Sequence, residues 1–502
     1  MFRKKFFCVC ISLLLSGFIA IQFSSAQTFD AIQSKIRTHV LKNGMKFIVL
    51  ERQQAPVVSF HVYADVGSAN ESYGITGISH LLEHMAFKGS KIVGTTNYEE
   101  EVKVLDEMDA LYENIKREEA KIAPDKQALE KMNARFEELR KKAKTYVVTD
   151  EFVDMLMKEG DRFVNAYTSN DATQYIDGLP SNKVEFWMSM TSDRFMNPVF
   201  REFYKERDVV MEERRLGVES RPLGRFIEDF FAVAFKAHPY HHGVVGHMSD
   251  LQSITRQDVK EYFNKFYGPN NLTVAIVGDV KAPEIFKMAE QYFGRIPGGE
   301  RPESIRTVEP EQWGERRATV EAMAQPFLIL GFHRPEVRHP DHYALEALAN
   351  ILGQGRSSRI YQSLVKEKKV SIECGAFNGF PGDKYPNLIA FYVVPAKGHT
   401  SDECLSLLDE ELEKLKKEAV TENELKKYKN MAVKRMLDRM KSNAGMAGML
   451  TYADAVLGDW SLAFTQVEKI QAVRAEDIQQ VAIRYLNKKN CTIGEIVSIN
   501  NK

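Results

Sequence analysis

The feature that most constrains the fold of this chain is an internal repeat. The segment ITRQDVKEYFNKFYGPNNLTVAIVGDV, starting at Ile254, aligns without gaps with VRAEDIQQVAIRYLNKKNCTIGEIVSI, starting at Val473. Each copy has the pattern of an amphipathic helix, a turn and a strand. The identical positions are Asp258 and Asp477, Asn271 and Asn490, and Thr273 and Thr492. A repeat of this kind predicts two domains of similar fold.

The order of strand and helix patterns gives the fold class. Both halves open with strands followed by helices, as in FLILGFHRP leading to HYALEALANILG in the second half. The Gly/Pro/Glu-rich stretch IPGGERPES, residues 296–304, is typical of a linker. We therefore predict an α+β protein with two similar domains, at 27–297 and 298–502. Each domain is expected to be a mostly antiparallel sheet packed with helices.

Residues 100–146 interrupt the first domain and predict an inserted helical hairpin. Apolar residues recur at three- and four-residue spacing on both sides of a Pro124–Asp125 break, in a background rich in Glu and Lys. They are Leu105, Met108, Tyr112, Ile115 and Ile122, then Leu129, Met132, Phe136, Leu139, Ala143 and Tyr146. This pattern predicts a locally self-sufficient pair of helices with facing coiled-coil seams. A docking arm and a plain structural excursion both fit it.

The N-terminus has the three-part layout of a secretory signal peptide. A basic start at Arg3–Lys5 precedes an apolar run from Phe6 to Phe23, and Ser24–Ala26 supplies the small residues before Gln27. A retained membrane anchor is the alternative, because the run is near the lower length limit for spanning. We expect removal of residues 1–26 and secretion across the inner membrane to the periplasm.

Charge and cysteine content exclude several classes of function. The 68 Lys and Arg residues nearly balance the 69 Asp and Glu residues, so a nucleic acid or an anionic membrane surface is not an expected partner. Without the signal, Cys374, Cys404 and Cys491 remain, and this odd, scattered set is neither a disulfide framework nor a cysteine metal site. No other apolar stretch approaches transmembrane length, so we expect a soluble mature protein outside the cytoplasm.

The stretch GISHLLEHMAFKGS, residues 77–90, contains a candidate metal site. Residues four apart lie on one face of a helix, so His80 and His84 can offer ring nitrogens to one ion. Catalytic zinc usually takes three protein ligands and keeps a fourth position for water. Glu83 lies beside that face and is placed to take a proton from such a water. Because H-x-x-E-H also arises by chance, the interpretation depends on a third ligand.

Candidates for the third ligand lie in REFYKERDVVMEERRLGVESRP, residues 201–222, which predicts an acidic helix. Glu206 and Glu213 are two turns apart on one face, so one carboxylate can bind a metal while the other supports the site. A solvated surface position for Glu213 fits the spacing equally well. The apolar stripe of the helix is expected at Val209, Val210 and Leu216.

Five motifs in order resemble the insulinase/pitrilysin family of zinc endopeptidases, whose signature is H-x-x-E-H rather than H-E-x-x-H. They are GISHLLEHMAFKGS, NAYTSNDATQYI, ERDVVMEERR, HPYHHGVVGH and YGPNNLTVAIVGDV. The resemblance covers nearly all of 36–497 outside the hairpin. In layout the chain is similar to the short members, such as the β subunit of mitochondrial processing peptidase and its bacterial counterparts.

The resemblance implies a role for each candidate residue. It implies one zinc ion per chain, held by His80, His84 and Glu213, with Glu83 as general base and Glu206 as a supporting carboxylate. The separation of His84 and Glu213 is larger than is usual in the family, and the inserted hairpin accounts for the excess.

The same resemblance implies how a substrate is held. The segment from Asn165 to Tyr175 would form the strand beside the site, and a substrate peptide would add to its edge in an extended form. Asn165 and Ala166 match the family's substrate-binding Asn-Ala pair. The histidines of HPYHHGVVGH, residues 238–247, are expected to be structural, because their spacing is loop-like.

The second half departs from the family pattern. Where the family has an Arg and a Tyr that bind the substrate carbonyl, the segment SRIYQSLVKEKKVSIEC has Val365 and Ile372, and neither can donate a hydrogen bond. ALEALANIL stands where a second H-x-x-E-H would fall. Short members pair two chains around the substrate, so we predict a heterodimer with a zinc-less sister subunit that restores the donors. A homodimer is the alternative.

The sequence thus predicts a zinc-dependent endopeptidase that hydrolyses extended or unfolded peptides in a chamber formed with a partner chain. A non-catalytic assembly or peptide-binding subunit of a larger complex is the alternative from another class. The complete set of His80, Glu83, His84 and Glu213 argues against it, because a scaffold needs none of them. A structural zinc domain fits less well, since structural sites usually have four ligands.

Overall fold

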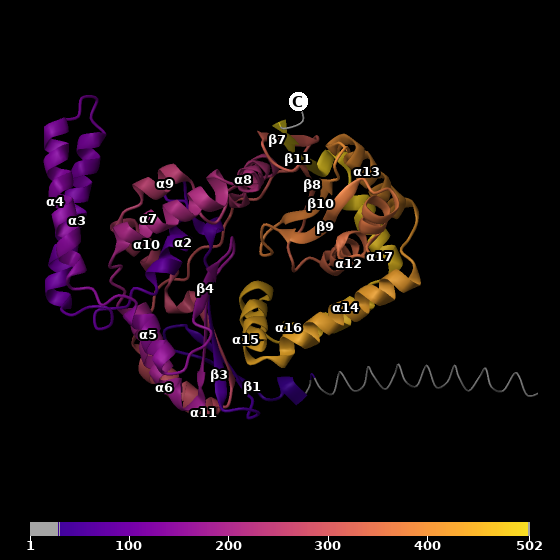
Figure 1. Ribbon diagram of the computed structural model, residues 1–502. Coiled ribbons are helices and arrows are strands. Elements are labelled where there is room, and N and C mark those ends of the chain that lie inside the picture. The colour runs from indigo at the N-terminus through magenta and orange to yellow at the C-terminus, as the bar shows by residue number, and fades with distance from the viewer. Residues whose placement is uncertain (1–28, 30, 500–502) are drawn as a thin grey trace, which may run out of the picture.

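The computed structural model describes residues 29 and 31–499 (Figure 1). The predicted signal peptide, residues 1–26, lies outside them. Two sheets packed with helices confirm the predicted α+β class. Within the described residues, no helix combines the length and the apolar character that a membrane span requires.

The first half is built on a six-stranded sheet in the order β1-β2-β6-β3-β5-β4. Its strands are β1 (Ile36–Val40), β2 (Lys46–Glu51), β3 (Val57–Ala64), β4 (Asn165–Thr168), β5 (Thr173–Pro180) and β6 (Leu272–Gly278). Only β2 and β6 run parallel. The turn between β1 and β2 contains Gly44, whose φ of 94° favours glycine. Strand β4 has one neighbour and forms an edge of the sheet.

Helices pack against this sheet and form the first core. They are α2 (Ile78–Met85), α5 (Glu151–Lys158), α6 (Val184–Met196), α7 (Phe203–Arg214), α9 (Met248–Ser253), α10 (Arg256–Phe266) and α11 (Ala282–Tyr292). Trp187 of α6 stacks on Phe60 of β3 with ring centroids 4.2 Å apart. The indole of Trp187 donates to Asp177 at 2.7 Å, so its polar atom is satisfied inside the core.

The predicted insertion is a helical hairpin of α3 (Tyr98–Glu119) and α4 (Lys126–Lys144), which projects from the first half (Figure 1). One expected seam residue is placed wrongly: Ile122 is fully exposed, because it lies in the turn between the helices. The hairpin is also less self-sufficient than expected. Arg256 of α10 donates to Asp106 at 2.7 Å and to Asp109 at 2.8 Å, which ties the middle of α3 to the domain.

The second half contains a five-stranded sheet in the order β7-β11-β8-β10-β9. Its strands are β7 (Arg316–Ala322), β8 (Phe327–Arg334), β9 (Ser371–Phe380), β10 (Asn387–Pro395) and β11 (Cys491–Ser498). Its helices are α12 (His342–Gly353), α13 (Ser401–Lys417), α14 (Glu422–Lys441), α15 (Asn443–Tyr452), α16 (Leu462–Ala472) and α17 (Ala475–Tyr485). Strand β9 is an edge, as β4 is in the first sheet.

The repeat found in the sequence is confirmed at the level of structure. Helix α10 leads into β6, and α17 leads into β11. Strand β6 lies between a parallel and an antiparallel neighbour, and so does β11. The matched asparagines make equivalent hydrogen bonds. The side chain of Asn271 donates to the carbonyl of Phe266 at 2.8 Å, and that of Asn490 donates to the carbonyl of Tyr485 at 2.9 Å.

Each half covers one face of the other half's sheet. Helix α8 (Pro222–Ala234) belongs to the first half and packs on β7 and β11, where Phe226 and Phe230 are fully buried. Helix α15 of the second half packs on β3 and β6 and buries Met446 and Leu450 there. The predicted domain limits at 297 and 298 stay a prediction, with residues 297–313 forming neither helix nor strand.

Candidate metal centre

Helix α2, which carries His80, Glu83 and His84, begins directly after Gly77. Gly77 has a φ of 92°, and a Cβ there would lie 2.3 Å from the carbonyl oxygen of Val245. Glycine is therefore required by both conformation and space. Because Gly77 has no side chain to cap the helix, Glu71 does so from outside. Its carboxylate accepts the backbone N–H groups of Gly77 and Ser79, each at 2.8 Å.

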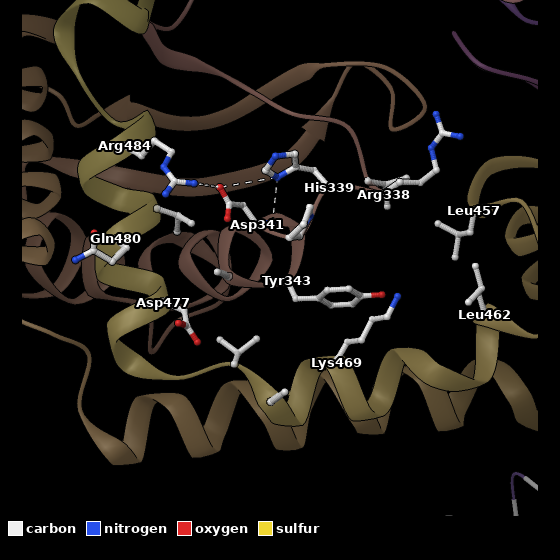
Figure 2. Close-up of a pocket in the computed structure, with 16 residues that line it drawn as sticks. Arg338, His339, Asp341, Tyr343, Leu457, Leu462, Lys469, Asp477, Gln480 and Arg484 are labelled. Carbon is white, nitrogen blue, oxygen red and sulfur yellow. Dashed lines mark hydrogen bonds and ion pairs between the residues drawn. The ribbon is translucent and has the colours of Figure 1, made fainter.

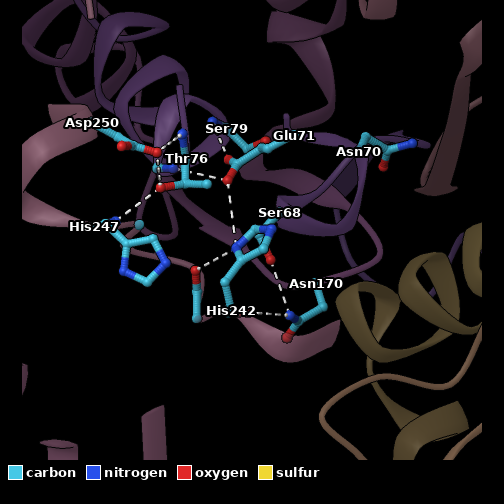
Figure 3. A network of polar contacts seen from close by, with 12 residues as sticks. Ser68, Asn70, Glu71, Thr76, Ser79, Asn170, His242, His247 and Asp250 are labelled. Carbon is cyan, nitrogen blue, oxygen red and sulfur yellow. Dashed lines mark hydrogen bonds and ion pairs between the residues drawn. The ribbon is translucent and has the colours of Figure 1, made fainter. Parts of the chain in front are cut away.

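A polar network fixes this helix start to the HPYHHGVVGH segment (Figure 3). The carboxylate of Asp250 accepts hydrogen bonds from the backbone N–H and from the hydroxyl of Thr76. That hydroxyl in turn accepts a hydrogen bond from the backbone N–H of His247. Burial lowers the pKa of His242 to about 4 and raises the pKa of Glu71, 3.9 Å away, to about 8. This segment therefore supports α2, and no second metal-binding group occurs among the described residues.

Three predicted ligands converge between α2 and α7, which pack against each other. The Nε2 atom of His80 lies 3.6 Å from the carboxylate of Glu213, and that of His84 lies 3.8 Å from it. All three donor atoms lie within 4.8 Å of one another. With metal–donor bonds of about 2.0–2.2 Å, tetrahedral coordination separates donors by roughly 3.3–3.6 Å. The donor set and its spacing fit one zinc ion.

The protonation of His80 is consistent with this fit. Burial lowers the pKa of His80 to about 4, and the nearby His84 adds to the effect. The ring is therefore neutral at pH 7, which is the form that binds a metal. Its Nδ1 atom is buried and has no hydrogen-bond partner among the described residues.

Glu206 lies behind His84, away from the three donor atoms. Its carboxylate is 3.5 Å from Nδ1 of His84 and accepts from Lys88 at 2.6 Å. Burial opposes ionisation of Glu206, but the hydrogen bonds from His84 and Lys88 outweigh it and lower its pKa to about 2. A permanently charged Glu206 orients the ring of His84. Lys88 was not singled out from the sequence, although it follows the motif by one helical turn.

Glu83 is held by a residue that the sequence interpretation missed. The hydroxyl of Thr168, on β4, donates to its carboxylate at 2.5 Å. Burial raises the pKa of Glu83, and the bond from Thr168 opposes that rise. A carboxylate with an elevated pKa is better suited to accept a proton near neutral pH. The alternation of strand side chains, which places Thr168 on the same face as Ala166, is the signal that could have identified it.

Strand β4 carries the predicted substrate-binding residues at the edge of the sheet. Asn165 is exposed, and Ala166 is buried. Because β4 pairs only with β5, its other edge keeps backbone groups that can receive an extended chain. Thr168 links this strand directly to Glu83, so the edge lies beside the candidate centre.

The predicted apolar stripe of α7 is partly wrong. Val210 is fully buried, but Val209 is 39% exposed and Leu216 is 58% exposed. The buried face instead contains charged residues, among them Glu206 and Arg214. These residues can be buried because they have partners; Arg214, for example, pairs with Glu228 at 2.9 Å. Apolar residues alone therefore do not mark the buried face of this helix, because α7 buries the face that carries Glu206.

The second half offers no donor at the two positions noted in the sequence. Val365 is half-buried against the second core, and Ile372 is 60% exposed on the edge strand β9. A cavity of about 800 Å³ also lies in this half, between α12, α16 and α17 (Figure 2). There Asp341 accepts from Arg484 at 2.5 Å. None of the predicted site residues lines this cavity.

Fold and donor group together define a two-domain α+β protein of the H-x-x-E-H type. The model of "Insulinase (Peptidase family M16)" matches residues 47–110, and that of "Peptidase M16 inactive domain" matches residues 253–432. Both models describe domains of the insulinase family, which confirms the resemblance seen in the five motifs.

Relatives of similar length support this assignment. The chain is 26% identical over 500 residues to "Zinc protease PqqE" of Helicobacter pylori, covering 97% of this chain and 98% of that protein. It is 22% identical to a probable mitochondrial-processing peptidase subunit beta of Arabidopsis thaliana, covering 92% and 78%. The crystal structure of a protease from Helicobacter pylori superposes with a TM-score of 0.76 at 25% identity, covering 92% and 99%.

Proposed function

We propose that this chain is a zinc-dependent endopeptidase that hydrolyses extended or unfolded peptides. The observation that carries the proposal is the convergence of His80, His84 and Glu213, whose donor atoms lie within 4.8 Å, with Glu83 on the same helix. Bound there, zinc would polarise the substrate carbonyl and acidify an attacking water. The names of the relatives, which include a zinc protease, support this reading.

The surrounding residues have distinct roles in this proposal. Glu83 accepts the proton of the attacking water and passes it to the leaving amine. Thr168 holds the carboxylate of Glu83 in place through its 2.5 Å bond. Glu206, fixed by Lys88, orients His84. The chain then needs no further acid or base for hydrolysis.

The substrate is proposed to add to β4 as an extra strand. Main-chain hydrogen bonds to the free edge hold any extended sequence, so the recognised feature is an unfolded backbone. Asn165 and Ala166 are the proposed contacts, because they lie on this edge strand next to the centre. A folded protein cannot present such a strand, which restricts the substrates to peptides and unfolded segments.

The partner is proposed to be a zinc-less sister subunit. Val365 and Ile372 cannot donate a hydrogen bond to a developing oxyanion at the two positions where the family has Arg and Tyr, and such donors typically contribute several kcal/mol. A sister chain that carries an Arg and a Tyr at those places would complete a closed chamber. A homodimer is the alternative. The predicted signal peptide would place the complex in the periplasm.

The non-catalytic alternative also has one observation in its favour. The residues matched by the family model for an inactive domain, 253–432, contain no metal-binding group. If the chain is an assembly or peptide-binding subunit, it should bind peptides without cleaving them, with or without its partner.

Metal removal tests the proposal. A long unstructured peptide is incubated with the chain isolated together with any co-purifying partner, and the products are identified by mass spectrometry. We expect a chelator to stop cleavage and about one equivalent of zinc per chain to restore it, as a single catalytic site requires. Cleavage that persists without metal, or a pure complex that never cleaves with zinc bound, would refute the peptidase.

The same preparation tests the partner. Light scattering gives the mass of the active species, and the chain expressed alone is compared with it. We expect activity to depend on a second, different chain. Pure homodimers with the full activity of the isolated complex would rule out the heterodimer.

A further inference from the structure

A second cavity, of about 520 Å³, lies between the two halves on the sheet face that is turned away from α2. The first half lines it with His61, Tyr167, Gln174 and Ile176, on β3, β4 and β5. The second half lines it with residues of α12, α14, α15 and α16. Of these helices, α15 lies beside β3 in Figure 1.

This cavity adjoins the strand that is proposed to receive the substrate. Tyr167 of β4 lines it, whereas the next residue, Thr168, reaches Glu83 on the opposite face. In an added strand, successive side chains also point to opposite faces of the sheet. Every second side chain of a peptide on β4 therefore points toward α2, and those between them point toward this cavity.

The charged groups that line the cavity are Glu346, Arg435 and Arg439. Arg435 donates to Gln354 at 3.0 Å and lies 4.0 Å from Glu346, so these two charges offset each other. Arg439 is exposed and has no hydrogen bond or ion pair with another described residue. His61 adds no charge at pH 7, because burial lowers its pKa to about 4. One guanidinium is left to face a ligand.

Part of the remaining wall is apolar and suits the methylene groups of a side chain. Met436 of α14 and Met449 of α15 lie in the lining, together with Ile176 of β5. Unbranched methionines adapt to side chains of different shape. A flexible acidic side chain can lie along these residues and still place its carboxylate at Arg439.

We propose that this cavity is a substrate subsite that binds a carboxylate through Arg439, so that the chain prefers acidic peptides. The proposal rests on the proposed function, because it assumes that a peptide adds to β4. The carboxylate can belong to a Glu or Asp side chain or to a free C-terminus. An exposed guanidinium should favour Glu over Gln by about tenfold, which corresponds to about 1.4 kcal/mol.

Binding and cleavage are measured separately, with matched peptides that contain either one Glu or one Gln in an otherwise neutral sequence. Binding is measured on the Glu83→Gln chain by fluorescence anisotropy, in peptides with an amidated or a free C-terminus. Cleavage sites are mapped with the wild-type chain while the Glu is moved one position at a time. We expect tighter binding of the Glu peptide by about tenfold. We also expect the Glu peptide to be cleaved faster than the Gln peptide only when the Glu occupies every second position counted from the cleaved bond.

Two variants of α14 decide whether Arg439 is responsible. Arg439→Gln should reduce the Glu-to-Gln binding ratio to about one. Lys434→Gln removes one charge from the same helix outside the cavity and should keep the ratio; Lys434 is paired with Asp438 at 2.6 Å. If only the free C-terminus matters, the carboxylate is terminal and the amidated peptides lose the advantage.

Equal binding of the two peptides with both kinds of terminus, or an unchanged ratio in Arg439→Gln, would overturn the subsite. Failure to bind any peptide would overturn it as well. The peptidase is judged independently by its metal dependence, so a chain that cleaves without acidic preference refutes the subsite alone.

Discussion

Glu83→Gln is expected to reduce peptide cleavage by about 10²- to 10⁴-fold, which is the usual contribution of a general acid-base group. The amide keeps the shape of the side chain and can still accept the bond from Thr168, but it cannot take a proton. Because Glu83 is not one of the three converging donors, the variant should still bind zinc. Initial rates on an unstructured peptide and the zinc content of the same preparation are measured together.

A matched control for this prediction lies on α7. Glu212 is adjacent to Glu213 but pairs with Arg215 at 3.0 Å at the surface. Glu212→Gln makes the same chemical change near the centre and should leave both rate and zinc content as in the wild type. If Glu83→Gln retains full activity, Glu83 is not the base; if it loses zinc, the lost activity says nothing about proton transfer.

Arg201→Met is expected to lower the free energy of unfolding by about 3–5 kcal/mol, as breaking a buried ion pair does. Arg201 is 1% exposed and Glu101, its partner at 2.9 Å, is fully buried. Arg201 also donates to the carbonyl oxygens of Lys88, Ser90 and Val93, which lie just after α2. The variant leaves the carboxylate of Glu101 without its ion-pair partner and removes one donor from each of these carbonyls. Urea denaturation followed by circular dichroism measures the loss.

The control for Arg201 is a surface arginine of the hairpin. Arg140 pairs with Glu137 at 2.9 Å, and both side chains are partly exposed. Because exposed pairs contribute about 0–1 kcal/mol, Arg140→Met should shift the transition little. If both substitutions lower the free energy of unfolding equally, the buried pair contributes no more to stability than the exposed pair.

Local patterns in the sequence predict the parts of the site that lie within one element. His80, Glu83 and His84 lie within two turns of one helix, so helical periodicity alone places them together. The repeat likewise predicts both helix–turn–strand units, since each is continuous in the chain. Glu213 required the resemblance to a family, because spacing alone left a surface position open.

Contacts between distant segments could not be predicted. The bond from Thr168 to Glu83 depends on where β4 lies in the sheet, and that of Lys88 to Glu206 depends on how α2 meets α7. The sequence also has no local signal that α8 of the first half packs on the second sheet, or that α15 of the second half packs on the first sheet. The error at Val209 has the same origin: hydrophobicity marks a buried face only if no charged side chain on another face finds partners there.

The most direct test of the central claim, that these residues hold the zinc, is an anomalous-difference map. Crystals of the chain grown with zinc would be measured at the zinc absorption edge. We predict one strong peak per chain, bounded by the Nε2 atoms of His80 and His84 and by the carboxylate of Glu213. A peak elsewhere in the chain, or no peak among these three residues, would contradict the assignment.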